Sequence, residues 1–481
     1  MPETVQSSLN FAAAAAEIYM IAAICVILLV DVFLSERNRW VTYALSLLAL
    51  AGAAFVTVTN GVDTRVTAFD GAFIADPMSD VLKLFAYGTV AVAFMYSREY
   101  LQRRSLFKGE YFILGLTNLL GIMVLCCAGS LVTVYLGVEL LSLSLYAMVA
   151  FDRDSGVAAE SAMKYFVLGA IASGLLLYGF SIIYGLTGTL QLDELAVAVR
   201  EVGPDKLGLV FGLAFIIAGV AFKFGAVPFH MWVPDVYHGA PTPVTLFVGS
   251  APKIGSFILA IRVLAEGLDS MVASWQGMLI ALSVLSMIIG NVVAIAQTNL
   301  KRMLAYSTIS HVGFILLGIL AGTSEGYRAA MFYTLVYIIM AVGSFGMILL
   351  LSREGFEGDE LEDFKGLNRR SPWFAAVMMM LMFSFAGVPP FVGFWAKILV
   401  LGAVVDVGLT WLAAVAVLLS VVGAFYYLRV IKLMYFDEPV GTVAVEGGGT
   451  LRTLLTANGL AVLALGIFPG ALMELCARVL P

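Results

Sequence analysis

The sequence has few charged residues for its length. Only 12% of its 481 residues are charged, whereas a soluble protein of this length would carry about twice that fraction. Hydrophobic residues make up 61% of the chain, and the mean hydropathy is +0.98. Apolar stretches long enough to cross a bilayer recur from one end to the other, which predicts an all-α polytopic membrane protein.

Motifs for nucleotide, metal and redox cofactors are also missing. The chain has no GxGxxG stretch, no P-loop and no pair of histidines at the spacing of haem ligands. Its four cysteines have neither iron–sulfur nor zinc spacing, so we expect them to be small buried hydrophobic residues. We therefore expect no cofactor, no metal and no redox active site in this chain, and no nucleic acid among its partners.

The apolar stretches divide into fourteen predicted spans. The first apolar segment runs long and lacks a basic leader, so we expect a first span and not a cleaved signal. The predicted spans are 15–33, 40–59, 79–97, 111–129, 131–150, 160–185, 207–233, 243–265, 273–297, 302–322, 328–351, 373–404, 408–432 and 453–475.

The distribution of basic residues between the loops predicts the orientation of the chain. With fourteen spans both termini lie on the same side, and one set of loops holds fifteen basic residues against five in the other set and the C-terminal tail. Loops rich in lysine and arginine stay in the cytoplasm. Both termini are therefore expected on the periplasmic side of a bacterial inner membrane. The five on that side are Arg65, Arg200, Lys206, Arg328 and Arg478.

Several ionisable residues lie within the predicted spans, where each costs about 2.5–3.5 kcal/mol on the insertion scale. Lys83, Arg262 and Arg429 are close to span ends, so we expect them to extend to the interface. Five others lie too deep for that and would cost on the order of 12–18 kcal/mol together if unpaired. These five are Glu139, Lys164, Lys223, Lys253 and Lys397.

Distances from the predicted turns suggest how these residues are matched in depth. Glu139 and Lys164 are each about twelve residues from the centre of the turn at 151–155. Lys223 and Lys253 are each fifteen residues from His238, the midpoint of the next turn on that side. Adjacent antiparallel helices would hold each pair at one depth, which predicts a row of polar groups along the midplane. The alternative is that these are structural pairs that fix helix register.

Prolines interrupt two of the spans. Pro228 lies in span 7, and the stretch GVPPF at 387–391 lies in span 12. Each proline removes a backbone donor, and broken helices near a lysine are typical of ion transporters. Spans 7 and 12 run in opposite directions, which predicts two inverted five-helix repeats, spans 4–8 (111–265) and 9–13 (266–432). Residues 1–110 would hold spans 1–3, and residues 433–481 a cytoplasmic loop and span 14.

Two of the three histidines are further candidates for proton transfer. His311 follows Ser307 by four residues and Thr308 by three, so the three side chains share a helix face. His230 lies in the first proline break. A near-neutral pKa suits imidazole to passing protons, although a structural role for His311 is an equal alternative. Lysines with one glutamate, histidines and hydroxyls favour protons as the transported ion.

Three long motifs, which contain several of the residues named above, resemble those of a known family, the antiporter-like subunits of respiratory complex I. They are KFGAVPFHMWVPDVYHGAPTPVT (223–245), NLKRMLAYSTISHVGF (299–314) and FSFAGVPPFVGFWAK (383–397). The shared core covers roughly residues 110–430. Within the family the chain is most similar to the subunit N branch, because SAPKIGSF follows the first motif and Lys397 is a lysine. His238 departs from the glutamate expected at its position.

The resemblance implies a role for each deep residue. Glu139 and Lys164 would form an input pair, Lys223 would be the central proton carrier, and Lys253 would relay protons toward Lys397 on the exit side. The chain would be one subunit of a proton-pumping NADH:quinone oxidoreductase, a translocase. Flavin, iron–sulfur clusters and quinone would then belong to other membrane-arm and peripheral-arm subunits. Two alternatives are a subunit of a multisubunit Na⁺/H⁺ antiporter and a membrane-arm scaffold without its own proton path.

Overall fold

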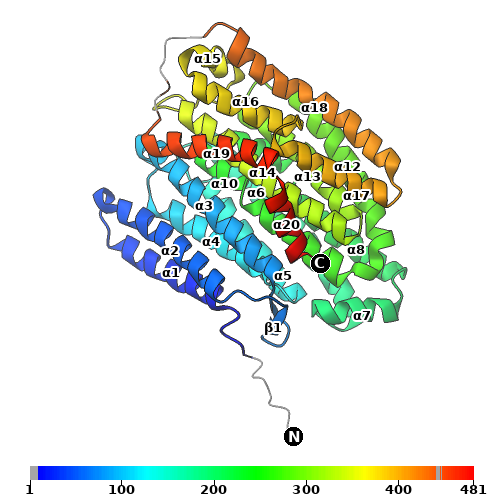
Figure 1. Ribbon diagram of the computed structural model, residues 1–481. Helices are drawn as coiled ribbons and strands as arrows, with labels where there is room; N and C mark the ends of the chain where they lie inside the picture. The colour runs from blue at the N-terminus through cyan, green and yellow to red at the C-terminus, as the bar shows by residue number, and fades with distance from the viewer. Residues whose placement is uncertain (1–8, 440–444, 446, 481) are drawn as a thin grey trace.

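The computed structural model describes residues 9–439, 445 and 447–480. Long helices lie side by side and run in nearly one direction across the molecule (Figure 1). The first half of the chain contains α1 (Ala15–Val32), η1 (Glu36–Asn38), α2 (Trp40–Thr59), β1 (Val66–Ala68), β2 (Phe73–Ala75), α3 (Pro77–Arg103), α4 (Gly109–Cys126), α5 (Leu131–Val149), α6 (Gly156–Thr187), α7 (Leu192–Val202), α8 (Leu207–Phe224), α9 (Trp232–Gly239), α10 (Thr242–Val248) and α11 (Pro252–Ala260).

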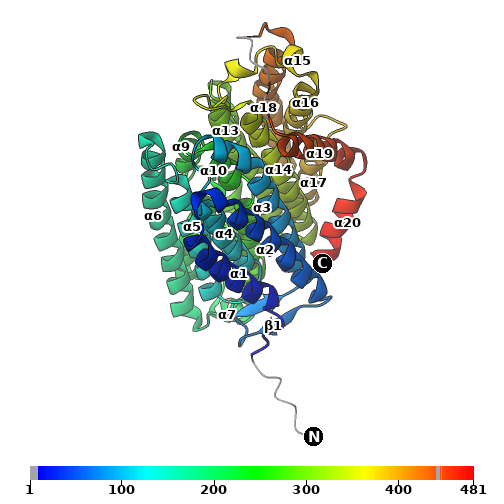
Figure 2. The same cartoon turned by 90° about the vertical axis from the view of Figure 1, so that its left-hand side faces the viewer.

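The second half of the chain continues the same bundle. Its elements are the π-helix η2 (Ile261–Gly267), then η3 (Asp269–Met271), α12 (Val272–Ile295), α13 (Leu300–Leu320), α14 (Ser324–Leu351), η4 (Leu361–Phe364), α15 (Leu367–Arg370), α16 (Pro372–Ala386), α17 (Val392–Asp406), α18 (Thr410–Phe436), α19 (Gly449–Ile467) and α20 (Gly470–Val479). Seen from the side, α6 lies at one edge of the bundle and α20 at the other (Figure 2).

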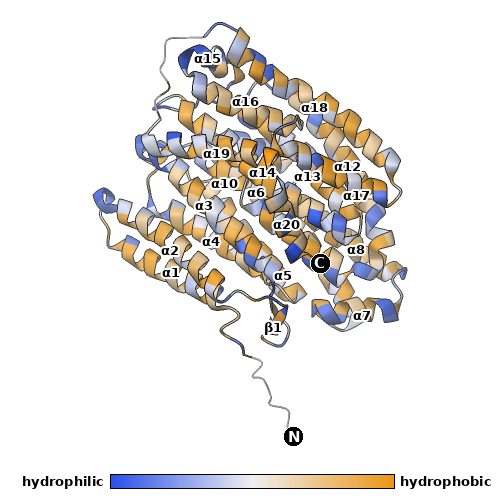
Figure 3. Cartoon of the chain, in the orientation of Figure 1, coloured by the Kyte–Doolittle hydropathy of each residue, from blue (hydrophilic) through white to orange (hydrophobic). Residues whose placement is uncertain are grey.

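The helices match the predicted spans closely. Thirteen helical segments of the described chain are long and apolar enough to cross a membrane. The remaining predicted span, 373–404, corresponds to α16 and α17, which are fifteen residues each. Apolar residues line the lengths of the helices and polar residues gather at their ends, at α7 and at α15 (Figure 3). The prediction of an all-α polytopic membrane protein is confirmed. The division into two inverted repeats stays a prediction.

Polar side chains set where several helices begin. Asp76 accepts a hydrogen bond from the Ser79 backbone nitrogen (2.8 Å), and the Ser79 hydroxyl accepts one from the Asp76 nitrogen (3.1 Å). Pro77 follows as the first helical residue of α3, where its missing donor costs nothing. Asn299 caps α13 in the same way, accepting from the Arg302 nitrogen at 3.1 Å.

The structure contains a break that the sequence analysis did not predict. α10 ends at Val248 and α11 begins at Pro252, inside predicted span 8. The Ser250 hydroxyl donates to the Leu246 carbonyl at 2.7 Å and satisfies one of the freed backbone groups. Gly249 and Pro252 flank the interruption and are the signal for it, because glycine and proline mark breaks in helices.

Three short elements were also not predicted, although the last of them begins inside predicted span 14. β1 and β2 form an antiparallel hairpin, with Val66 opposite Ala75. α7 and α20 are amphipathic helices of eleven and ten residues that lie outside the long apolar helices. Both follow a turn or break after a span, so the hydropathy of the spans carries no information about them.

Small residues allow adjacent helices to pack at close range. A Cβ atom on Gly290 of α12 would lie 2.5 Å from the Ser310 nitrogen of α13 and 2.8 Å from the Tyr306 carbonyl oxygen. Gly313 of α13 is equally close to the backbone of α12, 2.8 Å from the Ser283 oxygen. Close approach at glycine is a main source of helix association in lipid, where the hydrophobic effect between helices is absent.

The prediction that three cations near span ends extend to the interface is wrong for two of them. Lys83 is buried and forms ion pairs with Glu17 (3.3 Å) and Asp80 (3.2 Å). Arg262 is buried as well and pairs with Asp76 and Glu266, both at 2.7 Å. Each cation is reached by one carboxylate of its own helix and by one from another part of the chain, so both are neutralised in place.

The third cation, Arg429, is partly buried. It donates to the Ile295 carbonyl (2.8 Å) and the Gln297 carbonyl (2.6 Å) at the C-terminal end of α12. A cation there satisfies carbonyls that lack a helical partner.

The close contact of α12 with α13 leads to a stability prediction. Gly290→Leu should lower the free energy of unfolding of the detergent-solubilised protein by about 1–3 kcal/mol, and with it the melting temperature. The reason is that the new side chain meets backbone atoms that have no room to move. Gly277→Leu on the same helix is the matched control, since a Cβ there has no neighbour within 4 Å. Equal melting temperatures for the two variants would contradict this view of the contact.

Candidate proton-transfer site

The proline of the first helix break deprives one carbonyl of its usual partner, and a lysine binds that carbonyl. α8 ends at Phe224, whose carbonyl would bond the nitrogen of residue 228 in an unbroken helix. Residue 228 is proline and has no N–H to donate. Lys253 from α11 donates to this carbonyl instead, with 2.8 Å between Nζ and the oxygen. Gly225 has a positive φ of 78°, which turns the chain out of the helix.

The second break repeats this arrangement. α16 ends at Ala386, and the nitrogen that its carbonyl would accept from belongs to Pro390. Lys397 from α17 donates to the Ala386 carbonyl at 2.9 Å. Gly387 follows with φ of 83°. In both breaks a lysine ammonium thus takes the place of an amide hydrogen that proline removed.

A serine hydroxyl supports each break from the other side. The Val227 nitrogen donates to the Ser286 hydroxyl at 2.9 Å in the first break. In the second, the Gly393 nitrogen donates to the Ser384 hydroxyl at 3.0 Å. Irregular backbone at membrane depth is tolerated only where such partners exist. The two breaks are therefore satisfied by the same pair of chemical groups, a lysine and a serine.

Lys223 lies one residue before the Phe224 carbonyl and points to α5. Its Nζ donates to the Ser142 hydroxyl at 2.5 Å. Glu139 is three residues before Ser142 on the same helix face and acts on Lys223 electrostatically. One carboxylate oxygen of Glu139 is buried and makes no hydrogen bond within the described chain. Glu139 and Lys223 thus belong to one local group.

The structure does not bring Glu139 and Lys164 together, so the predicted pairing of these two residues is wrong. Lys164 pairs with Asp235 (2.9 Å) and Glu160 (2.9 Å), and its side chain is 45% exposed. Equal distance from a turn fixes depth, but it does not fix the direction in which a side chain leaves its helix. The Lys164 side chain reaches Asp235 on α9 instead.

Asp235 connects Lys164 to a second cation. It lies on α9, outside the long spans, and also accepts from Arg302 at 3.0 Å. Burial alone would raise the pKa of Asp235, but hydrogen bonds from Lys164 and Arg302 outweigh burial and hold that pKa below its usual value. Asp235 therefore stays a carboxylate at neutral pH and bridges the two cations.

Neutral groups surround Lys253 and Lys397. The Lys253 ammonium lies 5.9 Å from the centre of the Trp232 ring. Lys397 donates to the Ser420 hydroxyl at 2.8 Å and lies 5.2 Å from the centre of the Phe314 ring. Both lysines are buried. Carbonyls, hydroxyls and ring faces favour an ammonium without holding it in a salt bridge, so either lysine can lose its proton without leaving a carboxylate unpaired.

His311 lies beside the second break within a set of tyrosines. Its Nδ1 is 2.7 Å from the Tyr333 hydroxyl, and its Nε2 is 3.0 Å from the Tyr427 hydroxyl. Ser307 contacts the same Tyr427 hydroxyl at 2.5 Å, so two of the three residues predicted to share a helix face meet through this tyrosine. Lys397 acts on His311 electrostatically. His230, in the first break, is half-buried and its Nδ1 has no hydrogen-bond partner among the described residues.

The predicted residues thus form two groups. One contains Glu139, Lys223 and Lys253 at the first break, and the other contains His311 and Lys397 at the second. No hydrogen bond or ion pair between described residues joins the two groups directly. The sequence analysis missed the tyrosines around His311, although Tyr333 and Tyr337 share a face of α14 at a spacing of four residues.

Comparisons with known proteins agree with this architecture. A family model described as NADH:quinone oxidoreductase/Mrp antiporter, TM, matches residues 128–423. NADH-quinone oxidoreductase subunit N of Thiobacillus denitrificans is 60% identical over 474 residues, which cover 98% of this chain and 98% of that relative.

Solved structures give the same result. A chain of respiratory complex I from Thermus thermophilus is similar with a TM-score of 0.82 and 30% identity, covering 96% of this chain and 99% of that one. A chain of the Mrp complex from Dietzia shares the fold, with a TM-score of 0.84 at 21% identity, 98% of this chain and 97% of that one being covered. The resemblance drawn from the three motifs is confirmed, and the chain belongs to the NADH:quinone oxidoreductase/Mrp antiporter family of multi-pass membrane proteins.

Proposed function

We propose that this chain is a proton-translocating membrane-arm subunit of an NADH:quinone oxidoreductase. The relatives named NADH-quinone oxidoreductase subunit N align over nearly the whole chain and support this assignment. Electron transfer from NADH to quinone, with its flavin and iron–sulfur clusters, belongs to other membrane-arm and peripheral-arm subunits in this proposal. The observation that carries the proton role is the pair of buried lysines bound to neutral oxygens at two matching helix breaks.

The geometry suggests how these residues move a proton. Lys223 receives a proton while Glu139 stabilises its charge, and it passes the proton toward Lys253. The two lysines are linked by one intervening contact, because Lys253 donates to the carbonyl of Phe224, the residue that follows Lys223. Transfer onward to Lys397 crosses to the second break, where His311 and its tyrosines offer hydroxyl and imidazole groups. A change in the position or charge of Glu139 would change how firmly Lys223 holds its proton.

Replacement of Lys223 tests the proton role. Lys223→Ala should lower NADH-driven proton pumping by about 100-fold or more, the size of effect that positioned proton-transfer groups have. Lys223→Arg should fail as well, because guanidinium keeps its proton at working pH. The measurement is acidification of inverted membrane vesicles with NADH, in sodium-free buffer. Lys206→Ala, at an exposed lysine outside the spans, is the control.

The outcomes of this experiment separate the candidate functions. Full pumping by the Lys223→Ala enzyme would leave the chain as a scaffold without its own proton path. Wild-type vesicles that acidify only when sodium is present would favour the Na⁺/H⁺ antiporter. Pumping that is independent of sodium and lost with Lys223 supports the proposal.

The proposal places both termini on the periplasmic side, and labelling tests this orientation. Glu354→Cys, at an exposed position in the loop after α14, should react with a membrane-impermeant maleimide only in inverted vesicles. Asp205→Cys, exposed between α7 and α8, should react in intact cells. The unsubstituted protein gives the background, which includes the exposed Cys25. The reverse labelling pattern would overturn the orientation.

A further inference from the structure

A cavity of about 250 Å³ lies at one end of the bundle, where α1 and α5 both pack on α4. Three charged residues line it at the helix ends: Lys108 and Glu110 at the start of α4, and Arg153 in the turn after α5. The rest of its lining is apolar and consists of Leu28, Ile113, Leu114, Ala147, Ala150 and Phe151. The cavity therefore has a charged mouth and an apolar interior.

The charged and apolar parts of the cavity lie at different depths in the membrane. Lys108 is the N-cap of α4, and Leu114 lies six residues further along, about 9 Å by the rise of an α-helix. Leu28 is likewise one turn inside the end of α1. The headgroup layer of a bilayer is about 5–8 Å thick on each side of the hydrocarbon core. A group bound at Lys108 is therefore at headgroup depth, and Leu114 is at the depth of acyl chains.

The two cations of the lining have no carboxylate partner. Lys108 and Arg153 are exposed, and neither side chain forms an ion pair or a hydrogen bond with another described residue. Glu110 lies 3.6 Å from Arg39, a cation outside the cavity. The two aspartates that flank Arg153 in its turn do not line the cavity. The positive charge at the mouth is thus not neutralised by the groups around it.

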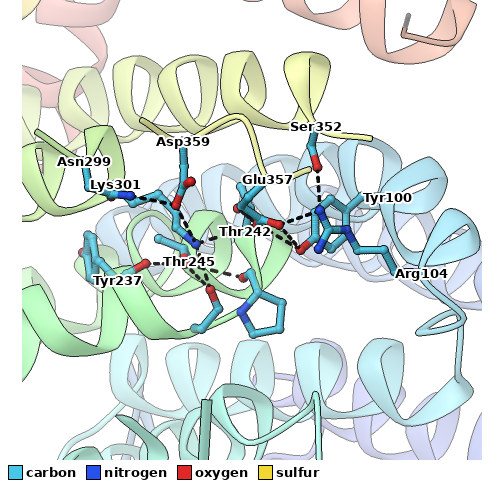
Figure 4. Close-up of polar contacts among 12 residues, drawn as sticks. Tyr100, Arg104, Tyr237, Thr242, Thr245, Asn299, Lys301, Ser352, Glu357 and Asp359 are labelled. Atoms are coloured by element: carbon cyan, nitrogen blue, oxygen red, sulfur yellow. Dashed lines mark hydrogen bonds and ion pairs between the residues drawn. The ribbon is translucent and has the colours of Figure 1, made fainter. Parts of the chain in front are cut away.

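Other cations at this end of the bundle are held by carboxylates of the protein itself (Figure 4). Arg104, just after α3, pairs with Glu357 at 2.7 Å. The buried Lys301 ammonium is 3.5 Å from Asp359 and 3.7 Å from Glu357. The two cations of the cavity lack such partners, so they are available to an anion from outside the chain.

The cavity is preformed because α1 and α4 are fixed to each other beside it. The Asp31 carboxylate of α1 lies against the start of α4, where a Cβ on Gly109 would overlap it. The Thr42 hydroxyl of α2 donates to the same carboxylate. On the other side, Ala147 and Ala150 are three residues apart at the end of α5 and share a face. Their small side chains leave the space between α1 and α5 open.

We infer that this cavity binds an anionic phospholipid, with its phosphate between Lys108 and Arg153 and the start of an acyl chain along α4. Basic pockets between transmembrane helices on the cytoplasmic side bind anionic lipid headgroups, and the orientation proposed above puts this end in the cytoplasm. A free phosphate would match only the two cations, whereas a lipid also fills the apolar interior. The site is separate from the two helix breaks and does not depend on the proposed proton role.

A photoreactive lipid tests the site in the assembled complex. The purified complex that contains this chain is reconstituted in phosphatidylcholine vesicles with a small fraction of phosphatidylglycerol that carries a diazirine near the start of one acyl chain. After illumination, labelled peptides are identified by mass spectrometry. The expected label lies on residues 109–126 and 131–151, and it should clearly exceed the label from phosphatidylcholine that carries the same diazirine.

Removal of the two cations should abolish the preference for the anionic lipid. Lys108→Gln combined with Arg153→Gln should lower labelling by phosphatidylglycerol about 30-fold, since each basic residue near a membrane surface contributes a factor of about five. Labelling by phosphatidylcholine should stay unchanged. Arg369→Gln combined with Lys432→Gln is the control, because it removes two exposed cations from ion pairs outside the cavity.

A second variant tests the apolar interior without changing any charge. Ala147→Phe puts a ring into the cavity from an exposed position and should lower labelling by both lipids. Ala159→Phe, at an exposed position near the start of α6, is its control. If the charge variant does not assemble, Ala147→Phe decides alone, and undiminished label would overturn the inference.

Three other results would also overturn it. They are equal labelling by the two lipids, labelling that survives the loss of both cations, and a wild-type complex without label on these peptides. The last result would mean that another subunit covers the cavity. Lipid labelling does not report on proton pumping, so its failure would leave the proposed function standing, and a failure of pumping with Lys223→Ala would leave the lipid site standing.

Discussion

Two carbonyl groups that proline deprives of a partner, those of Phe224 and Ala386, are the constraint on which the rest of the site depends. Inside a membrane no bulk water can bind them, and a buried polar group left unpaired costs about 1–3 kcal/mol in proteins. Lys253 and Lys397 remove this cost by donating to the two carbonyls. Two lysines within the bilayer thereby stabilise two breaks in the helices of the protein.

The same contacts explain why these lysines differ from other buried cations in the chain. Lys83 and Arg262 are buried as well but pair with carboxylates, so loss of a proton there would leave an uncompensated negative charge. The partners of Lys253 and Lys397 are carbonyls, hydroxyls and aromatic rings, which are neutral. Their charge can change while the protein around them stays satisfied. The four cations do not differ in burial, so the chemistry of the partner is what separates a structural cation from one that can transfer a proton.

The sequence predicts the spans and two of the breaks well, because both follow from local rules. Apolar length fixes a span, and Pro228 and Pro390 each remove a specific hydrogen bond. The break before Pro252 was missed, since isolated glycines and prolines in a long apolar run leave it reading as one continuous span. The pairing of Glu139 with Lys164 was wrong because distance from a turn carries no information about direction around the helix axis. The tyrosines around His311 come from helices far apart in the chain, and their meeting depends on tertiary packing.

The most direct measurement separates the structural role of Lys253 from its proton role by comparing two variants of that residue. Lys253→Gln keeps a neutral donor for the Phe224 carbonyl on a side chain one bond shorter, whereas Lys253→Met has the same length as the glutamine and no donor. Thermal stability of the purified complex and NADH-driven pumping in vesicles are measured for both. The account predicts that neither variant pumps and that only the methionine variant loses stability. A glutamine variant that pumps, or a methionine variant as stable as the wild type, would contradict it.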